Sequence, residues 1–202
     1  MKFLAKLISC LFHPMLMPLL GVFIIFSSGV DAGVLSGEGR KIVYTIVFIS
    51  SSILPLSLLP LFYQFGVIKS FNMETSRERV IPLFFTALFY YLGYMLLRKI
   101  GLSGFISLFL LSTLFVIFII IVISFFWKIS LHTTALGGVT GALLALLLIN
   151  GSIMVFVVPV ILICGGITAS ARLYLGAHTP AQVYSGYFFG LVAVFSFTTF
   201  FY

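Results

Sequence analysis

Charged residues are scarce in this sequence of 202 residues, where Asp, Glu, Lys and Arg together make up only 7%. A soluble globular domain carries roughly 25% of them, whereas this chain is 62% hydrophobic and has a mean hydropathy of +1.30. This composition excludes water as the main solvent. We therefore predict an all-α fold, a polytopic membrane helix bundle. Each crossing takes about 20 residues, so we expect residues 1–202 to form a single integral membrane domain.

Acidic residues and cysteines are also few. Four Asp and Glu stand against 11 Lys and Arg, which gives a formal net charge of +7. In a short-looped membrane protein this excess indicates positive-inside loops, or attraction to anionic lipid headgroups or phosphate. No basic run is interleaved with aromatic residues, so we expect no nucleic-acid partner. Three scattered histidines without acidic residues at ligand spacing do not predict a metal site, and we expect no cofactor.

Apolar segments separated by short polar breaks run through the whole chain. The first contains Pro14 and Pro18, which predict a broken or partly interfacial helix, and the number of spanning helices is six or seven depending on it. Lys2 and Lys6 ahead of an apolar stretch also fit a secretory signal, but we favour a retained helix. The segments lie at about 3–28, 42–66, 80–97, 103–126, 133–149, 153–169 and 183–201.

Three polar loops, 67–79, 127–132 and 170–182, are separated from one another by two crossings apiece. They are therefore expected on the same face of the membrane, whether or not the first segment spans. The opposite face receives only four cations, Arg40, Lys41, Arg98 and Lys99. The shared face collects the chemically interesting side chains, namely Arg77, Arg79, Lys128, His132, Arg172 and His178.

These residue types are typical of a phosphoryl-transfer site. Histidine acts as nucleophile or general acid near neutral pH, and arginine matches phosphate oxygens with a bidentate fork. Phosphoryl transfer needs little more than an in-line nucleophile, an acid and cations on the equatorial oxygens. Simpler interpretations stay open: Arg77 and Arg79 fit a solvated positive-inside loop, Lys128 beside Trp127 fits an interfacial anchor, and each histidine fits a polar helix end.

Two short motifs resemble those of the type 2 phosphatidic acid phosphatase superfamily. Arg172 lies six positions before His178, as in the third motif of that family, and Ile129-Ser130-Leu131-His132 stands where the family has Pro-Ser-Gly-His. The resemblance covers roughly residues 67–190. It implies that His178 is the nucleophile that forms a phosphohistidine and that His132 protonates the leaving alkoxide. Ser130 and Arg172 would hold phosphate oxygens.

The sequence departs from the family pattern at several positions. The serine before the arginine is Ala171, the aspartate four residues after the nucleophile is Gln182, and the first motif is not reproduced around Arg77 and Arg79. Gln182 can still accept a hydrogen bond from His178 one helical turn away, but it supplies no charge. Glu74 or Glu78 on the converging loop would be the alternative source of that charge.

Three functions follow as hypotheses. The first is a membrane phosphatase, a hydrolase acting on a lipid or isoprenoid phosphate, with catalytic His178, His132 and Arg172. Its substrate-binding residues would be Ser130, Arg77, Arg79, Lys128 and Gln182. The second is an impaired relative that binds a phosphorylated lipid without hydrolysis, and the third a structural or transport protein. For all three we expect an integral membrane protein of the bacterial cell inner membrane, and the oligomeric state stays open.

Overall fold

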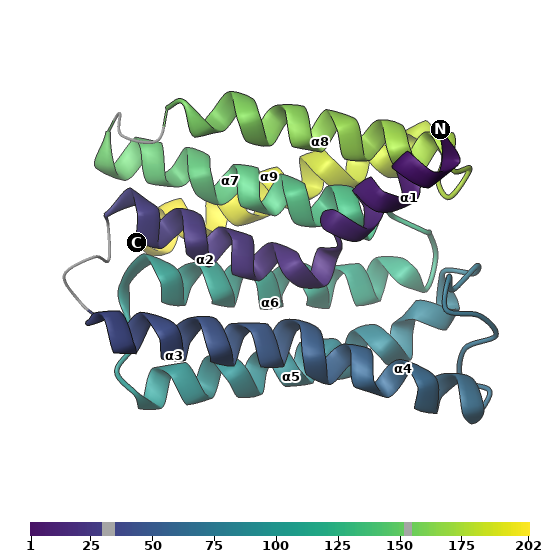
Figure 1. The fold of residues 1–202 in the computed structure, drawn as a ribbon, viewed down its shortest axis with the longest axis horizontal. Helices are drawn as coiled ribbons and strands as arrows, with labels where there is room; N and C mark the ends of the chain where they lie inside the picture. Colours follow the sequence, from purple (N-terminus) through teal and green to yellow (C-terminus); the bar gives the residue numbers. More distant parts are fainter. Residues whose placement is uncertain (30–34, 152–154) are drawn as a thin grey trace.

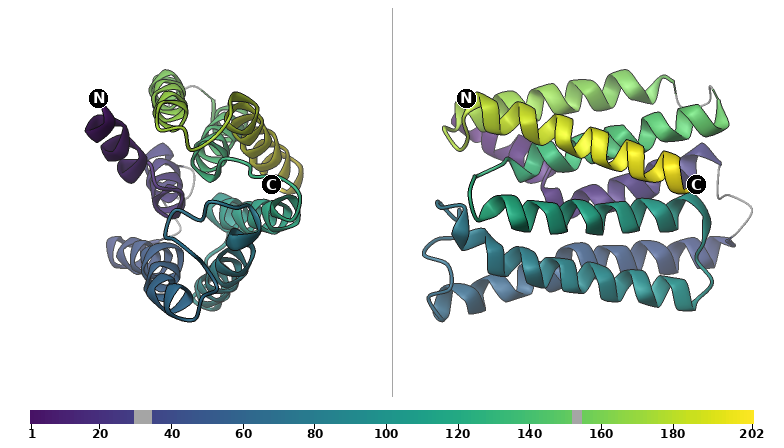
Figure 2. Two further views of the ribbon diagram at one scale, coloured as in Figure 1. Left: turned by 90° about the vertical axis from the view of Figure 1, so that its right-hand side faces the viewer. Right: turned by 180° about the vertical axis from the view of Figure 1, so that it is seen from behind.

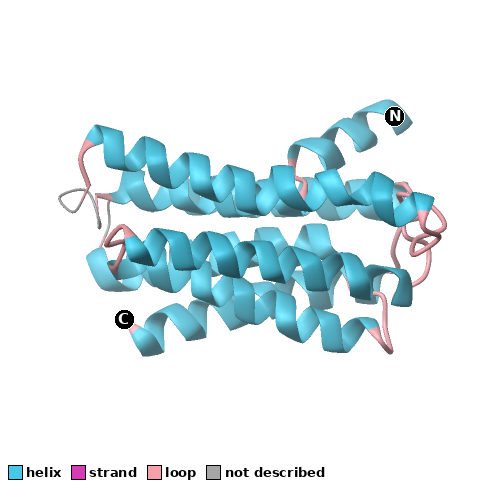
Figure 3. Ribbon diagram, turned by 90° about the horizontal axis from the view of Figure 1, so that it is seen from below, coloured by secondary structure: helices cyan, strands magenta, loops and turns pink. Residues whose placement is uncertain are grey.

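The computed structural model describes residues 1–29, 35–151 and 155–202, and within these ranges it is helical with no strand (Figures 1 and 3). The long helices run side by side along one axis, which confirms the predicted all-α bundle. The main helices are α1 (Lys2–Leu11), α2 (Met17–Ser28), α3 (Gly37–Phe48), α4 (Leu54–Gln64), α5 (Val80–Lys99), α6 (Gly104–Ser124), α7 (Leu131–Asn150), α8 (Val157–Tyr174) and α9 (Pro180–Phe201).

Seven helical segments of the described chain are long and apolar enough to cross a membrane. Their outward faces carry large apolar side chains: Phe23, Phe84, Phe118 and Phe188 are each exposed by 58% or more. Such a surface is stable in lipid and not in water. The chain is therefore an integral membrane protein.

The first segment is broken at its two prolines, as predicted. α1 ends at Leu11, a short 3₁₀ helix η1 spans Pro14–Leu16, and α2 then runs to Ser28. The Met15 carbonyl accepts hydrogen bonds from the hydroxyls of Ser51 (3.1 Å) and Ser52 (2.9 Å). These serines belong to a π-helical turn, Ile49–Ile53, that joins α3 to α4. The break is thus held in place by side chains inside the bundle.

Two predicted boundaries near the functional loops need correction. We placed Arg172 in the loop 170–182, but α8 continues to Tyr174, so Arg172 lies in the last helical turn. We began the last helix at 183, but it starts at Pro180. Thr179 caps that helix and Pro180 has the fixed φ suited to a first helical position, which moves the start forward.

The polar loops converge at one end of the bundle, on the right in Figure 1, together with the amino terminus. This confirms the prediction from counting crossings. The left panel of Figure 2 looks onto that end, where the connections α4–α5, α6–α7 and α8–α9 gather. The carboxyl terminus lies at the opposite end.

α7 and α9 form the closest helix pair of the bundle and set the geometry of that end. Gly137 and Gly190 allow the contact, because a Cβ at Gly137 would overlap the Tyr187 carbonyl and one at Gly190 the Thr134 carbonyl. Small residues let helix backbones approach in this way within membranes. The pairing brings the amino-terminal turns of α7 and α9 together.

We expect Gly190→Ala to destabilise the protein by about 3 kcal/mol, because overpacking against rigid backbone is costly. The measurement is the thermal midpoint in detergent. Gly166→Ala is the matched control, since a Cβ at Gly166 meets nothing within 4 Å. Removing a glycine from that exposed helix position should stabilise slightly. Equal midpoints for the two variants would contradict the close α7–α9 contact.

Candidate functional site

The loop before α5 and the loop before α7 are joined by two cations. Arg79 closes the 3₁₀ turn η3 (Arg77–Arg79), is only 7% exposed, and donates from Nη1 to the Ile129 carbonyl at 3.1 Å. Lys128 donates from Nζ to the Glu74 carbonyl. Both predicted cations therefore lie next to Ser130 and the start of α7.

The amino-terminal turns of α7 and α9 are joined by direct hydrogen bonds. The Ser130 amide donates to the Gln182 carbonyl at 3.2 Å, and the Thr133 hydroxyl donates to the Val183 carbonyl at 2.9 Å. A Cβ at Gly186 would lie 2.9 Å from the Ser130 carbonyl, so only glycine fits this approach. These contacts bring His178, which immediately precedes the α9 cap, to the start of α7.

Gln182 orients the His178 ring. Its Oε1 accepts a hydrogen bond from the Thr179 amide at 3.2 Å and lies 3.1 Å from His178 Nδ1. A backbone amide can only donate, so the atom facing it is the oxygen, and His178 Nδ1 must then carry the proton. Nε2 is left with a free lone pair, and it has no hydrogen-bond partner in the described chain.

This arrangement also explains why Gln182 suits its position. It is the third helical residue of α9 and completes a capping box with Thr179, so the oxygen that holds His178 also caps the helix. The predicted contact between Gln182 and His178 is present in the structure. The amide nevertheless carries no charge to stabilise a protonated ring.

Burial and, to a smaller extent, the nearby cations Arg79, Arg172 and Lys128 lower the pKa of His178 to about 4, while the Gln182 hydrogen bond works in the opposite direction. The imidazole is therefore neutral at pH 7. Burial and the charge of Arg79 also lower the pKa of Lys128. His178 is thus a neutral imidazole with cations around it.

His132 is held by α1. Its Nε2 lies 3.1 Å from the Ser9 carbonyl, which can only accept, so Nε2 is protonated and donates. Its ring packs edge-on against His13, with centroids 5.4 Å apart. His13 in turn caps η1, accepting from the Met15 amide at 3.4 Å.

Arg172 reaches the same region from the end of α8. Its Nη1 donates to the Ser9 hydroxyl at 3.4 Å, while its buried Nε has no hydrogen-bond partner in the described chain. The Ser130 hydroxyl is fully buried and likewise has no partner there. Unsatisfied buried polar atoms are costly, so these two point to a missing acceptor.

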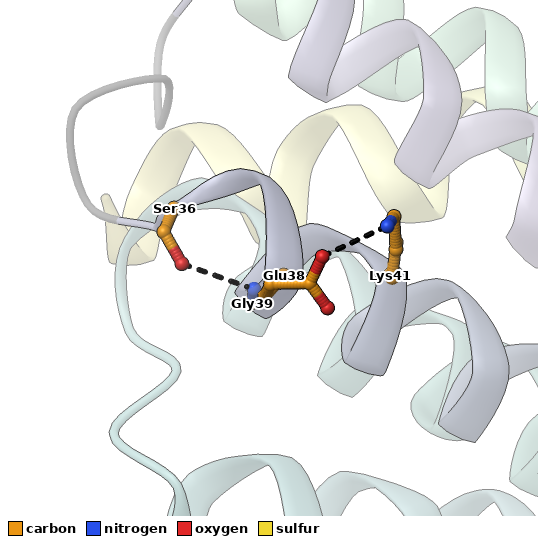
Figure 4. A network of polar contacts seen from close by, with 4 residues as sticks. All are labelled: Ser36, Glu38, Gly39 and Lys41. Carbon is orange, nitrogen blue, oxygen red and sulfur yellow. Dashed lines mark hydrogen bonds and ion pairs between the residues drawn. The ribbon is translucent and has the colours of Figure 1, made fainter.

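We call Arg79, Lys128, Ser130, His132, Arg172 and His178 the cationic site. None of its cations forms an ion pair. The only ion pair of the described residues joins Lys41 to Glu38 at 2.8 Å, near the Ser36-capped start of α3 at the far end of the bundle (Figure 4). Glu78 bonds within its own loop, to Thr75 and the Lys69 amide. A cluster of unpaired cations, with Arg79 buried and Lys128 and Arg172 partly buried, is an anion-binding arrangement.

Some predicted residues lie outside this cluster, and one contributor was missed. Arg77 is exposed and makes no side-chain hydrogen bond or ion pair with the described residues, so it does not join the cationic site. Ser9, by contrast, contacts both His132 and Arg172. Nothing in its local sequence marked it, since a serine in an apolar helix is ordinary. No group of three or more His, Cys, Asp or Glu in the described chain is placed to hold a metal ion.

The chain matches no protein-family model, no curated protein and no solved structure. The site is consequently interpreted from its own residues and geometry.

We expect Gln182→Glu to raise the pKa of His178 from about 4 toward its ordinary value near 6.5, because a carboxylate favours the charged ring. Glutamate also completes a capping box, so α9 should be unaffected. The measurement is an NMR pH titration of the imidazole. Gln182→Met, which removes the acceptor at similar length, should lower the pKa instead. An unchanged pKa in both variants would contradict the observed hydrogen bond.

Proposed function

We propose that this protein is a membrane phosphatase that hydrolyses a lipid or isoprenoid phosphate through a phosphohistidine at His178. The observation that carries the proposal is the state of His178: Nδ1–H is held by Gln182 and Nε2 is free, beside Arg79 and Arg172. A neutral imidazole with an available lone pair is a competent nucleophile. The unpaired cations supply the charge that a phosphoryl group requires.

The proposed reaction has two steps. The Nε2 lone pair of His178 attacks phosphorus, the ester P–O bond breaks, and the departing alkoxide takes a proton, relayed from solvent through His132, to become an alcohol. Water then attacks phosphorus, the P–N bond breaks, and phosphate leaves with a proton released to solvent. Arg79, Arg172 and Lys128 stabilise the phosphoryl oxygens throughout. The ring becomes cationic while phosphorylated, and Gln182 Oε1 accepts its Nδ1–H.

The resemblance assigns the leaving-group proton to His132, and Ser9 bears directly on this role. The Nε2–H of His132 is donated to the Ser9 carbonyl, so it reaches a ligand only if α1 shifts. A bound anion would compete with Ser9 for both His132 and Arg172, which supports such a shift on binding. We therefore infer that substrate replaces Ser9 as the partner of these two side chains.

The second candidate is a protein that binds a phosphorylated lipid without cleaving it. The neutral Gln182 favours it, because replacing an orienting carboxylate by its amide lowers turnover by roughly 10⁴-fold in the serine-protease template. Both candidates share the anion site and differ only in turnover.

The test is phosphate release from a lipid phosphate by purified protein, together with acid quenching to detect an acid-labile, base-stable phosphoprotein. Binding is followed in parallel by the fluorescence of Trp127, the single tryptophan, which adjoins Lys128. Release with a trapped phosphoprotein supports the phosphatase. Binding without release leaves the non-catalytic binder, and neither would leave the structural or transport interpretation.

A further inference from the structure

A cavity of about 110 Å³ lies between the helices of the bundle and is partly open on one side. Residues of η1, α2, α5, α6, α7 and α9 line it. Its walls are almost wholly apolar and include Pro14, Leu83, Phe109, Ala135, Gly138 and Val194. Protein interiors are normally close-packed, so an internal space of this size calls for an occupant.

The threonine hydroxyls on the cavity wall have no free donor to offer water. The hydroxyls of Thr86, Thr113 and Thr134 each donate to a carbonyl of their own helix, at 2.8, 2.7 and 2.8 Å. Tyr90 lies near Ser51, which is itself bonded to the Met15 carbonyl. A water molecule needs two to four polar partners, and apolar cavities without them stay dry. The natural occupant is therefore an apolar group.

The cavity begins one helical turn beneath the cationic site, on the two helices that Arg79 and Ser130 cap. On α5, Leu83 follows Arg79 by four residues; on α7, Thr134 follows Ser130 by four. Four residues of helix rise about 6 Å. If the cationic site holds the phosphate of a ligand, the first apolar atoms of the attached chain would thus lie at the mouth of the cavity.

We propose that this cavity receives the apolar chain of the ligand whose phosphate the cationic site holds. The inference rests on the proposed function and goes further, placing the chain inside the bundle rather than along its lipid-facing surface. The cavity extends from Leu83 to Tyr90 on α5 and from Leu131 to Val139 on α7, so its depth is about 11 Å. Phe109, near the start of α6, and Val194 line the part farthest from the cationic site.

An alternative path lies outside the bundle, in an apolar groove of about 590 Å³ between α1 and α8. It passes Ala171, next to Arg172, and Gly166 farther along the helix. Only Arg172 of the cationic site belongs to an element of this groove. The internal cavity, by contrast, is lined by α5, which begins directly after Arg79, and by α7, which begins directly after Ser130. Membrane lipid would fill the groove without any ligand.

The test uses water-soluble alkyl phosphates of increasing length, from butyl to octyl, and inorganic phosphate. Trp127 fluorescence reports binding to purified protein in nanodiscs, referred to the free aqueous concentration. Each buried methylene should raise affinity roughly fourfold until the chain meets the cavity floor. Ala135→Phe should lower octyl phosphate affinity at least tenfold and leave inorganic phosphate unchanged.

Gly166→Phe is the matched control, because it places the same side chain in the outer groove, where a Cβ meets no neighbour. It should leave octyl phosphate affinity unchanged. A loss with Gly166→Phe and none with Ala135→Phe would overturn the proposal in favour of the outer groove. If neither variant alters octyl phosphate affinity while phosphate binding persists, the alkyl chain stays in lipid. The cavity proposal then fails and the proposed function does not. If wild type does not bind inorganic phosphate, the proposed function fails as well.

A second measurement needs no substitution. Octyl phosphate with a terminal diazirine, bound to the unmodified protein and irradiated, should label residues at the deep end of the cavity, such as Tyr90, Phe109 or Val194. Competition by inorganic phosphate should abolish the labelling. Labelling confined to the lipid-facing side of α8 would overturn the internal location.

Discussion

His178→Ala is expected to reduce phosphate release by about 10⁴-fold or more, since the proposed nucleophile is lost and no covalent intermediate can form. No acid-labile phosphoprotein should be trapped. Phosphate affinity should change little, because Arg79, Arg172 and Lys128 remain. The measurements are phosphate release and Trp127 fluorescence on the same preparation.

His13→Asn is the matched control for that variant. Asparagine is a good helix cap, so it preserves the acceptor that His13 provides at the start of η1, while removing a second imidazole from the same region. Turnover should remain within about tenfold of wild type. If His178→Ala retained wild-type release, or if His13→Asn abolished it and His178→Ala did not, the nucleophile would have to be another group.

Arg172→Met is expected to weaken phosphate binding by about 10- to 150-fold, the 1.5–3 kcal/mol of a charged hydrogen bond. The ligand-free protein should keep or gain thermal stability, because the variant removes a buried guanidinium whose Nε has no partner. The two effects have opposite signs, and a purely structural arginine would not give both. The measurements are Trp127 fluorescence titration and the thermal midpoint with and without phosphate.

Arg77→Met is the control, since Arg77 carries the same charge on the same end of the bundle but is exposed and outside the cationic site. It should change neither phosphate affinity nor the midpoint appreciably. A large loss of stability in Arg172→Met with normal phosphate affinity would mean that this arginine serves only to tie α8 to Ser9 on α1.

The contacts of His178 could be predicted from the sequence, and those of His132 could not. The four-residue spacing of His178 and Gln182 implies one helical turn, and a cap at Thr179 makes that turn regular, so the contact was predictable. His132 makes its contact with Ser9, 123 residues away in the chain. Such a contact follows from the path of α1, which the proline break redirects.

The sequence by itself determined the helical membrane fold, the broken first segment and the shared face of the three loops. The fold follows from the composition and the break from the chemistry of proline, which are both properties of the local sequence. The shared face follows from counting crossings, because successive loops alternate between the two faces of the membrane. Helix ends were less certain, as the positions of Arg172 and Pro180 illustrate, because a polar residue can end a span or lie in its last turn.

Only the tertiary structure decided which residues of that face meet. Arg79 and Arg77 are two residues apart and chemically identical, yet one is buried against the Ile129 carbonyl and the other exposed. The difference depends on how the 3₁₀ turn η3 directs Arg79 toward the loop that precedes α7. Likewise, the internal cavity arises from the packing of six elements, and none of their individual sequences shows it. Long-range packing set these features, and no local pattern encodes it.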